Sequence, residues 1–202
     1  MGPMVMAGVM ISKNDEAKLK ALGVKDSKLL TRDKRDKMFD KIIDIAKSTR
    51  IIVIEPKEID DALNSVELNL NKLEAVKSAL IINEFNPDTT ILDCPSNNKS
   101  SYVDYLKVYL KNKDKEIIAE HKADVKYPVV SAASILAKVT RDREMDKINA
   151  KYGEVGPGYP SNAITQKFIK ENWEKHPEIF RKTWATFKNQ VKNKTQKKIG
   201  DY

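Results

Sequence analysis

Apolar residues recur along this chain with two different spacings, and the two spacings alternate. Short runs rich in β-branched residues are typical of strands, whereas longer segments with apolar residues three and four positions apart are typical of helices. The predicted strands are Met4–Ile11, Ile51–Ile54, Thr89–Leu92 and Glu116–Ala119. The predicted helices are Asp15–Leu22, Thr31–Lys47, Leu68–Phe85, Ser100–Leu110, Pro128–Tyr152 and Ala163–Lys175, with a helical turn at Glu58–Leu63. This order of elements predicts an α/β domain with a mixed sheet flanked by helices.

Residues with special backbone or capping properties mark several predicted helix ends. Gly23 follows an apolar helix and suits a left-handed C-cap. Thr31 and Ser161 are suited to N-cap positions, because their hydroxyl groups can accept a hydrogen bond from the first helical turn. Pro128 fits the first turn of its helix, where a missing N–H leaves no bond unmade.

The last quarter of the chain differs in character from the rest. Gly156–Pro160 predicts a rigid loop, and Arg181–Lys198 contains many cations and no acidic residue. We therefore expect a domain of residues 1–152 and a small helical C-terminal extension, 153–202, with a basic tail. The start of the tail, up to Lys188, is predicted to lie along a phosphate backbone with salt-dependent affinity. Its end is predicted to be disordered, and the alternative is that the whole tail is a solvated, frayed terminus.

Composition limits the class of protein and its partners. The chain has 202 residues, a formal net charge of +8 and a pI near 9.3, which favours a polyanionic partner without identifying it. Cys94 is the single cysteine, so no intrachain disulfide can form, and we expect a cytoplasmic location. The apolar run at Met4–Ile11 is too short to span a bilayer, and no membrane association is expected.

Two aspartates follow predicted strands. Asp93 ends the run Thr89–Leu92, and Asp124 comes shortly after Glu116–Ala119 and ahead of a helix. Open α/β sheets build sites at such strand ends, and carboxylates there could converge on a divalent cation such as Mg²⁺ or Mn²⁺. The alternatives are a turn-initiating Asp93 and a capping Asp124 beside a buried helix.

Several segments, taken together and in order, are similar to one known family. These are Gly2–Gly8, Val24–Leu30, Leu92–Ser96, His121–Asp142, Gly156–Ser161 and Arg181–Trp184. The chain resembles ribonuclease HII, the type 2 ribonuclease H family, especially its archaeal form. The resemblance covers nearly the whole chain and implies a ribonuclease H-like fold.

This resemblance also implies an activity. The family consists of endoribonucleases that hydrolyse the RNA strand of RNA–DNA hybrids and cut at ribonucleotides embedded in duplex DNA, in replication and repair. Two divalent metal ions, Mg²⁺ or Mn²⁺, activate a water molecule and stabilise the leaving 3′ oxygen. A monomer is expected.

Site residues follow from the same resemblance. Asp93 and Asp124 match two of the family's four metal-binding carboxylates and are the expected catalytic residues. Tyr159 matches the tyrosine that stacks near the ribonucleotide and senses its 2′-hydroxyl group. Phosphate contacts are matched by Lys28 and by the cluster of Arg181, Lys182 and Thr183. Without the resemblance, packing or surface roles would be the favoured explanation for each of the substrate-binding residues.

One family motif is absent. The family carries Asp-Glu-Ala-Gly-Arg-Gly on its first, central strand, just before the segment matched by Gly2–Gly8, and residues 1–202 do not contain it. Two of the family's metal-binding carboxylates and the Gly-Arg-Gly that contacts the substrate backbone belong to this motif, so they are absent as well. Loss of a central strand predicts a marginally stable or unfolded chain. A start codon assigned too far downstream is the simplest explanation, and a true fragment or a degenerate paralogue is the alternative.

Three functions therefore stay open at this point. The complete product is expected to be the metal-dependent enzyme. A catalytically impaired fragment or paralogue would bind hybrids without cutting, and a basic structural protein would bind nucleic acid with no hybrid preference. A sliding-clamp partner is also considered, because Gln196–Tyr202 contains part of the pattern of a clamp-binding motif.

Overall fold

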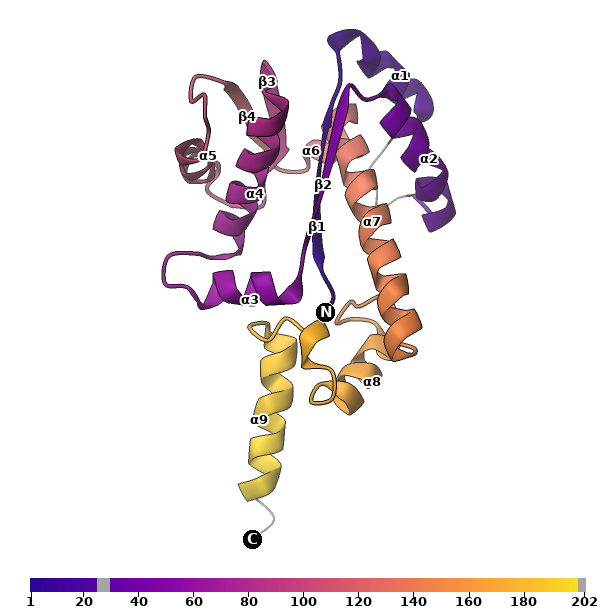
Figure 1. The fold of residues 1–202 in the computed structure, drawn as a ribbon, viewed down its shortest axis with the longest axis vertical. Helices are drawn as coiled ribbons and strands as arrows, with labels where there is room; N and C mark the ends of the chain where they lie inside the picture. Colours follow the sequence, from indigo (N-terminus) through magenta and orange to yellow (C-terminus); the bar gives the residue numbers. More distant parts are fainter. Residues whose placement is uncertain (25–29, 200–202) are drawn as a thin grey trace. The chain divides into compact units, whose positions relative to one another are not determined.

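The four strands found among the described residues form two pairs (Figure 1). The computed structural model describes residues 1–24 and 30–199, with side chains described up to residue 194. Strand β1 (Met4–Met10) pairs with β2 (Ser48–Ile54), and β3 (Thr89–Asp93) pairs in parallel with β4 (Glu116–Glu120). Among the described residues the two pairs form separate sheets, with no strand between β1 and β3. This is the arrangement expected of a ribonuclease H-like sheet without its central strand.

Helices make up most of the rest of the described chain. The α-helices are α1 (Glu16–Leu22), α2 (Arg32–Ile45), α3 (Pro56–Asn64), α4 (Leu70–Phe85), α5 (Lys99–Val108), α6 (Ala123–Lys126), α7 (Pro128–Tyr152), α8 (Ala163–Asn172) and α9 (Ala185–Ile199). Short 3₁₀ turns are η1 (Lys13–Asp15) and η3 (Pro177–Ile179). No helix in residues 1–24 or 30–199 is long and apolar enough to cross a membrane.

Helix boundaries confirm most of the predicted caps and correct one. Gly23 ends α1 in the left-handed region (φ 76°), and Thr31 accepts a hydrogen bond from the backbone of Lys34 at 3.3 Å. The cap of α8 is Asn162 rather than Ser161, because the Asn162 side chain accepts the Thr165 N–H at 3.1 Å. The prediction of Ser161 as the cap was therefore wrong by one residue.

The basic tail also differs from its prediction. The segment after Lys188 was expected to be disordered, but the backbone continues in α9 as far as Ile199. Lysine and glutamine, which recur in this segment, are good helix formers, and the segment contains no proline or glycine before residue 200. The disorder prediction is wrong for this stretch.

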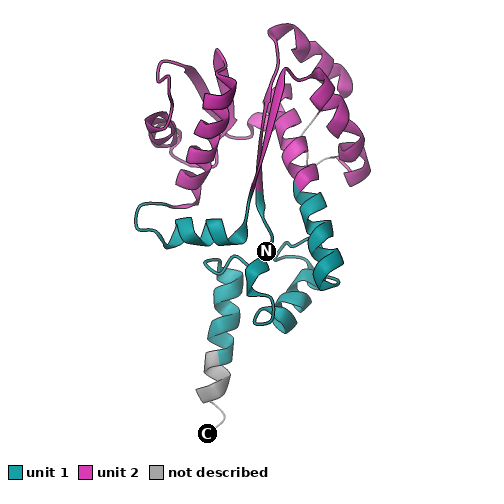
Figure 2. Cartoon of the chain, in the orientation of Figure 1, with its two compact units in different colours: residues 1–4, 54–68, 141–202 teal, residues 5–53, 69–140 magenta. Residues whose placement is uncertain are grey.

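The chain divides into two compact units (Figure 2). Unit 1 comprises residues 1–4, 54–68 and 141–202, and unit 2 comprises residues 5–53 and 69–140. The division predicted from sequence, 1–152 and 153–202, was based on the change in residue character after Gly153 and stays a prediction.

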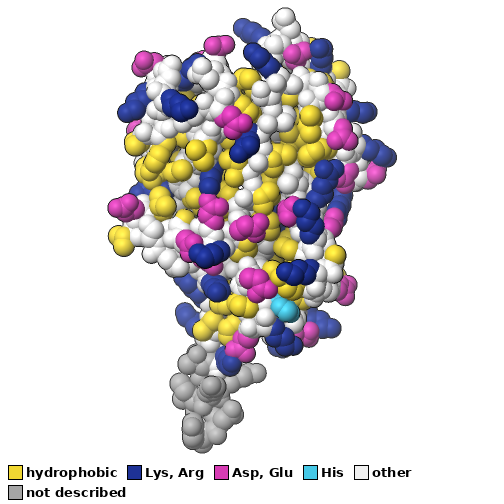
Figure 3. All heavy atoms as spheres, in the orientation of Figure 1, with side chains coloured by type: hydrophobic (Ala, Val, Ile, Leu, Met, Phe, Trp, Pro, Cys, Tyr) yellow, Lys and Arg dark blue, Asp and Glu magenta, His cyan; other side chains and the backbone are white. Residues whose placement is uncertain are grey.

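Each unit has its own apolar core. One core of unit 2 lies among α1, α2 and the first part of α7, and a second lies between α4, α5 and the β3–β4 pair. The core of unit 1 gathers Met145, Val155, Phe168, Ile169 and Phe180. No residue of β1 is fully buried, and apolar atoms reach the surface over the strands of unit 2 (Figure 3).

Candidate active site

The two predicted metal ligands lie at the same end of the β3–β4 pair. Parallel pairing aligns Asp93 with Glu120, so both strands present their carboxyl ends at one edge. The ladder continues one step further, because the Cys94 N–H donates to the Glu120 carbonyl at 2.8 Å. His121 Nδ1 is 3.1 Å from the Cys94 carbonyl oxygen, which joins the two turns that follow the strands.

A hydrogen bond links the Asp93 side chain to the backbone just before Asp124. The Ala123 N–H donates to Asp93 Oδ1 at 3.2 Å, and Asp124 is the next residue along the chain. Lys122 adopts a left-handed conformation (φ 56°), so the chain turns sharply before α6 begins. Asp124 is 5% exposed, whereas Asp93 is open to solvent. The structure therefore places Asp93 against the backbone of the residue that precedes Asp124.

The neighbouring carboxylate Glu120 has partners of its own. It forms an ion pair with Lys126 and accepts a hydrogen bond from the Tyr127 hydroxyl at 3.0 Å. The hydrogen bond from Lys126, followed by that from Tyr127, holds the pKa of Glu120 below its usual value. These contacts fix α6 against the end of β4 and leave the aspartate pair as the candidate ligand set.

The donor chemistry of this edge partly fits a divalent metal. Carboxylate oxygens are the ligands that Mg²⁺ and Mn²⁺ prefer. Within the described parts of the chain, however, no group of three or more His, Cys, Asp or Glu side chains is placed to hold a metal ion. Asp93 and Asp124 therefore stay the predicted metal ligands of this edge, and the described residues add no third carboxylate to them.

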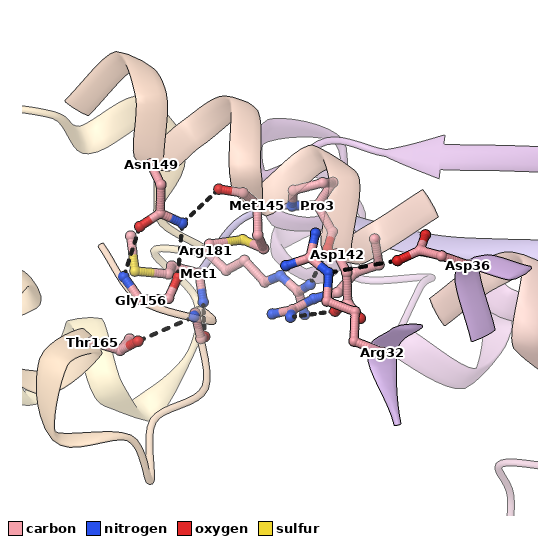
Figure 4. Close-up of polar contacts among 12 residues, drawn as sticks. Met1, Pro3, Arg32, Asp36, Asp142, Met145, Asn149, Gly156, Thr165 and Arg181 are labelled. Atoms are coloured by element: carbon pink, nitrogen blue, oxygen red, sulfur yellow. Dashed lines mark hydrogen bonds and ion pairs between the residues drawn. The ribbon is translucent and has the colours of Figure 1, made fainter. Parts of the chain in front are cut away.

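Tyr159 lies in a loop of unit 1 that is fixed by side chains from the helices before and after it. Asn149 Oδ1 accepts the N–H groups of Val155 and Gly156 at 2.8 and 2.9 Å, and Figure 4 shows Asn149 beside Gly156. Thr165 is fully buried, and its hydroxyl accepts the Gly158 N–H at 3.1 Å and donates to the Val155 carbonyl at 3.0 Å. This network holds the loop that presents Tyr159.

The ring of Tyr159 has a cationic neighbour that the sequence did not reveal. The guanidinium of Arg141, in α7, lies over the ring at 4.2 Å from its centroid, and Tyr159 remains 43% exposed. Gly158 has φ 79°, and a Cβ atom there would lie 3.0 Å from Arg141 and 2.9 Å from Met145. Glycine at this position therefore allows the loop to approach α7 closely.

Arg181 is tied to the backbone of unit 1. Its Nε and Nη2 atoms donate to the carbonyl oxygens of Gly2 and Pro3 at 3.0 and 2.9 Å, and its guanidinium lies 4.4 Å from the centroid of the Trp184 ring. Burial, followed by the charge of Arg141, lowers the pKa of Arg181 to about 10. Two of its donors are thus committed within the protein, whereas Lys182 is exposed.

The other predicted phosphate contacts have different surroundings. The Thr183 hydroxyl donates to Asp60 Oδ1 at 2.6 Å. The two residues are far apart in the sequence, and the contact was not predicted. Lys28 lies outside the described residues, as do residues 200–202 of the segment considered for clamp binding.

Carboxylates at adjacent strand ends, on paired strands flanked by helices, are typical of the ribonuclease H-like class of proteins. Residues 1–187 match the family model for Ribonuclease HII. The chain is 45% identical over 205 residues to the Ribonuclease HII of Methanococcus maripaludis (strain C7), covering 98% of this chain and 84% of that protein. The chain belongs to the ribonuclease HII family, whose members are nucleases.

Solved structures agree with this assignment. The structure is similar to ribonuclease H2 from Pyrococcus horikoshii OT3, with a TM-score of 0.85, 39% identity, and coverage of 96% of this chain and 92% of that one. It is also similar to RNase HII in the PCNA:RNase HII complex from Archaeoglobus fulgidus, with a TM-score of 0.81, 33% identity, and coverage of 94% and 88%. The predicted ribonuclease H-like fold is confirmed.

Proposed function

We propose that this protein is an endoribonuclease that hydrolyses the RNA strand of RNA–DNA hybrids and cuts at ribonucleotides embedded in duplex DNA. The observation that carries the proposal is the hydrogen bond from the Ala123 N–H to Asp93, which places Asp93 beside Asp124 at the carboxyl ends of two parallel strands. Family membership supplies the reaction class.

Asp93 and Asp124 would supply some of the ligands of a divalent metal ion, Mg²⁺ or Mn²⁺. Two such ions, when bound, would activate the attacking water and stabilise the leaving 3′ oxygen. The residues of this chain would do the rest: Asp93 and Asp124 supply carboxylate oxygens, Tyr159 stacks beside the ribose, and Lys28 and Lys182 contact phosphates.

A second function is favoured by one observation. The described residues provide a pair of carboxylates rather than a cluster of three or four. Residues 1–202 by themselves would then be a hybrid-binding protein with impaired cleavage, and the upstream Asp-Glu-Ala-Gly-Arg-Gly strand would restore the enzyme.

The partners proposed follow from chemistry and from the relatives. A net charge of +8 suits binding to a polyanion such as an RNA–DNA hybrid or a duplex that contains ribonucleotides. We propose that the protein acts as a monomer. The Archaeoglobus relative was solved with PCNA, which supports a sliding clamp as a further partner. The lone cysteine supports a cytoplasmic location.

The test compares residues 1–202 with a version extended by the missing motif. Both are incubated with an RNA–DNA hybrid and with a duplex containing one ribonucleotide, in Mg²⁺, in Mn²⁺ and in EDTA. The extended protein should cleave both substrates only with metal, and residues 1–202 should bind hybrid with little cleavage. No metal-dependent cleavage by a folded extended protein would overturn the enzymatic proposal, and robust cleavage by residues 1–202 would overturn the second.

A further inference from the structure

Asp60 is a buried carboxylate with an unusual set of partners. It lies in α3 and is 7% exposed. Its Oδ2 atom accepts the Lys182 N–H at 2.8 Å, and its Oδ1 atom accepts the Thr183 N–H at 2.9 Å and the Thr183 hydroxyl at 2.6 Å. All these groups belong to unit 1. One side chain therefore fixes the backbone of a turn more than 120 residues away in sequence.

Two consecutive backbone N–H groups and a hydroxyl that converge on one point form an anion-binding concavity. Here the carboxylate of Asp60 fills it. A hydroxyl has one proton to donate, and that of Thr183 goes to Asp60. The Thr183 side chain and the two N–H groups are thus used inside the protein, which leaves them without a donor for a phosphate.

Arg181 is constrained in a different way. Two of its donors are bound to the Gly2 and Pro3 carbonyls, and its guanidinium stacks on Trp184. Lys182 lies between these two anchored residues and is the exposed cation of the turn. An exposed ammonium on a rigid turn loses less conformational freedom on binding than one on a mobile loop.

We propose that Asp60 is a positioning residue that holds the turn of residues 181–184, and that Lys182 is the residue of this turn that contacts a nucleic-acid phosphate. The proposal rests on the proposed function, because it assigns the roles within a cluster expected to bind the substrate backbone. It separates one contacting side chain, Lys182, from two that hold it in place, Asp60 and Thr183.

The chain offers a matched control on the same helix. Asp61 is the next residue and carries the same charge, but its side chain is 63% exposed and forms an ion pair with Lys57 at 2.6 Å. Asp60→Asn and Asp61→Asn both raise the net charge by one, which by itself would slightly strengthen binding to a polyanion. In Asp60→Asn, one of the two oxygens that accept hydrogen bonds from the turn becomes an NH₂ group, which cannot accept them. Asp61→Asn changes no contact of the turn.

The experiment measures binding of residues 1–202 to a fluorescent RNA–DNA hybrid as a function of salt, for wild type, D60N, D61N, K182Q and the double variant D60N/K182Q. Loss of one phosphate contact should reduce the slope of log affinity against log salt by about 1. We expect K182Q and D60N to show this change, with affinity about three- to ten-fold weaker at about 50 mM salt. The double variant should be no weaker than K182Q alone, and D61N should match wild type.

A merely structural role would lower the melting temperature of D60N without changing the salt slope of the folded fraction. An unchanged slope in D60N, or additive losses in the double variant, would overturn the positioning role. An unchanged slope in K182Q would overturn the phosphate contact.

A second pair of variants serves if D60N does not fold. Thr183→Ser keeps the hydroxyl that donates to Asp60, and Thr183→Val removes it at nearly constant volume. We expect T183S to keep the wild-type slope and T183V to lose part of it, and equal slopes in the two would contradict the proposal. Failure of the proposed function would look different, because the folded extended protein would then show no metal-dependent cleavage of the hybrid, whatever the salt slopes of the variants.

Discussion

The guanidinium of Arg141 covers one side of the Tyr159 ring at 4.2 Å from the centroid. The Arg141 side chain is 12% exposed, so it is fixed within unit 1, while Tyr159 is 43% exposed. A cation stacked on an aromatic ring orients the ring, and the interaction is worth about 0.5–2 kcal/mol. The ring is therefore held in place before any substrate arrives.

Replacing Tyr159 should impair cutting at a single embedded ribonucleotide. In the protein extended by the upstream motif, Tyr159→Ala should reduce cleavage roughly ten-fold or more, because base–aromatic stacking is worth about 1–3 kcal/mol. Tyr159→Phe keeps the ring over Arg141 and should retain more activity. Binding to ordinary duplex DNA, measured in parallel, should barely change, since phosphate contacts dominate it. Equal losses on both nucleic acids would point to a collapsed loop.

Removing either aspartate charge should abolish metal-dependent cleavage. In the extended protein, Asp93→Asn or Asp124→Asn should reduce the single-turnover rate by orders of magnitude, because each carboxylate is a proposed metal ligand. Thermal stabilisation by Mn²⁺ should fall as well. Asp114→Asn, at an exposed position in the connection between β3 and β4, is the control and should behave like wild type. Near-wild-type turnover in either variant would remove that residue from the site.

Glu74, in α4, should make stability depend on pH. Burial raises the pKa of its carboxyl group to about 7, from an ordinary value of 4.5. Between these values the folded state holds the proton more tightly than the unfolded state, so stability falls as pH rises from about 4.5 to 7. The upper limit of this loss is about 3 kcal/mol.

Urea unfolding at pH 5 and pH 8 measures the Glu74 effect directly. Glu74→Gln, which is neutral at both values, should show a smaller loss between them and should be more stable than wild type at pH 8. The same pH dependence in wild type and E74Q would assign the effect to other groups.

Gly8, in β1, is predicted to tolerate no side chain. A Cβ atom there would overlap Ile81 Cγ2 and lie 3.2 Å from Phe85, both in α4. Gly8→Ala should therefore destabilise the protein by roughly 1–3 kcal/mol. Ile81→Ala removes the clashing atom, and in a double-mutant cycle the cost of Gly8→Ala should shrink in that background. A cost below about 0.5 kcal/mol in the wild-type background would show that α4 adjusts freely.

Local chemistry allowed much of the fold to be predicted. Helix α7 begins at Pro128 and ends at Tyr152 as expected, because a first-turn proline and the following Gly153 mark its ends. The turn predicted around Glu58–Leu63 is in fact the nine-residue helix α3, since Pro56 starts it earlier. The choice between Ser161 and Asn162 as a cap depended on backbone geometry that composition does not reveal.

The site was predictable only in part. Asp93 ends one predicted strand and Asp124 follows shortly after another, so both were expected at the same edge once those strands were taken to be parallel neighbours. Asp60, Arg141, Asn149 and Thr165 gave no local signal, because each acts through a partner whose position depends on tertiary packing. The contact between Asp60 and Thr183 spans 123 residues, and no periodic pattern encodes such a distance.

The pairing of strands in twos has a consequence for amide hydrogen exchange. Every described strand has a single ladder partner, so about half of its N–H groups point away from that partner. Exchange rates along β1 and β3 should therefore alternate between slow and fast from one residue to the next, whereas the central turns of α7 should be uniformly slow. Addition of a strand that pairs with both β1 and β3 would convert the fast residues to slow ones, residue by residue.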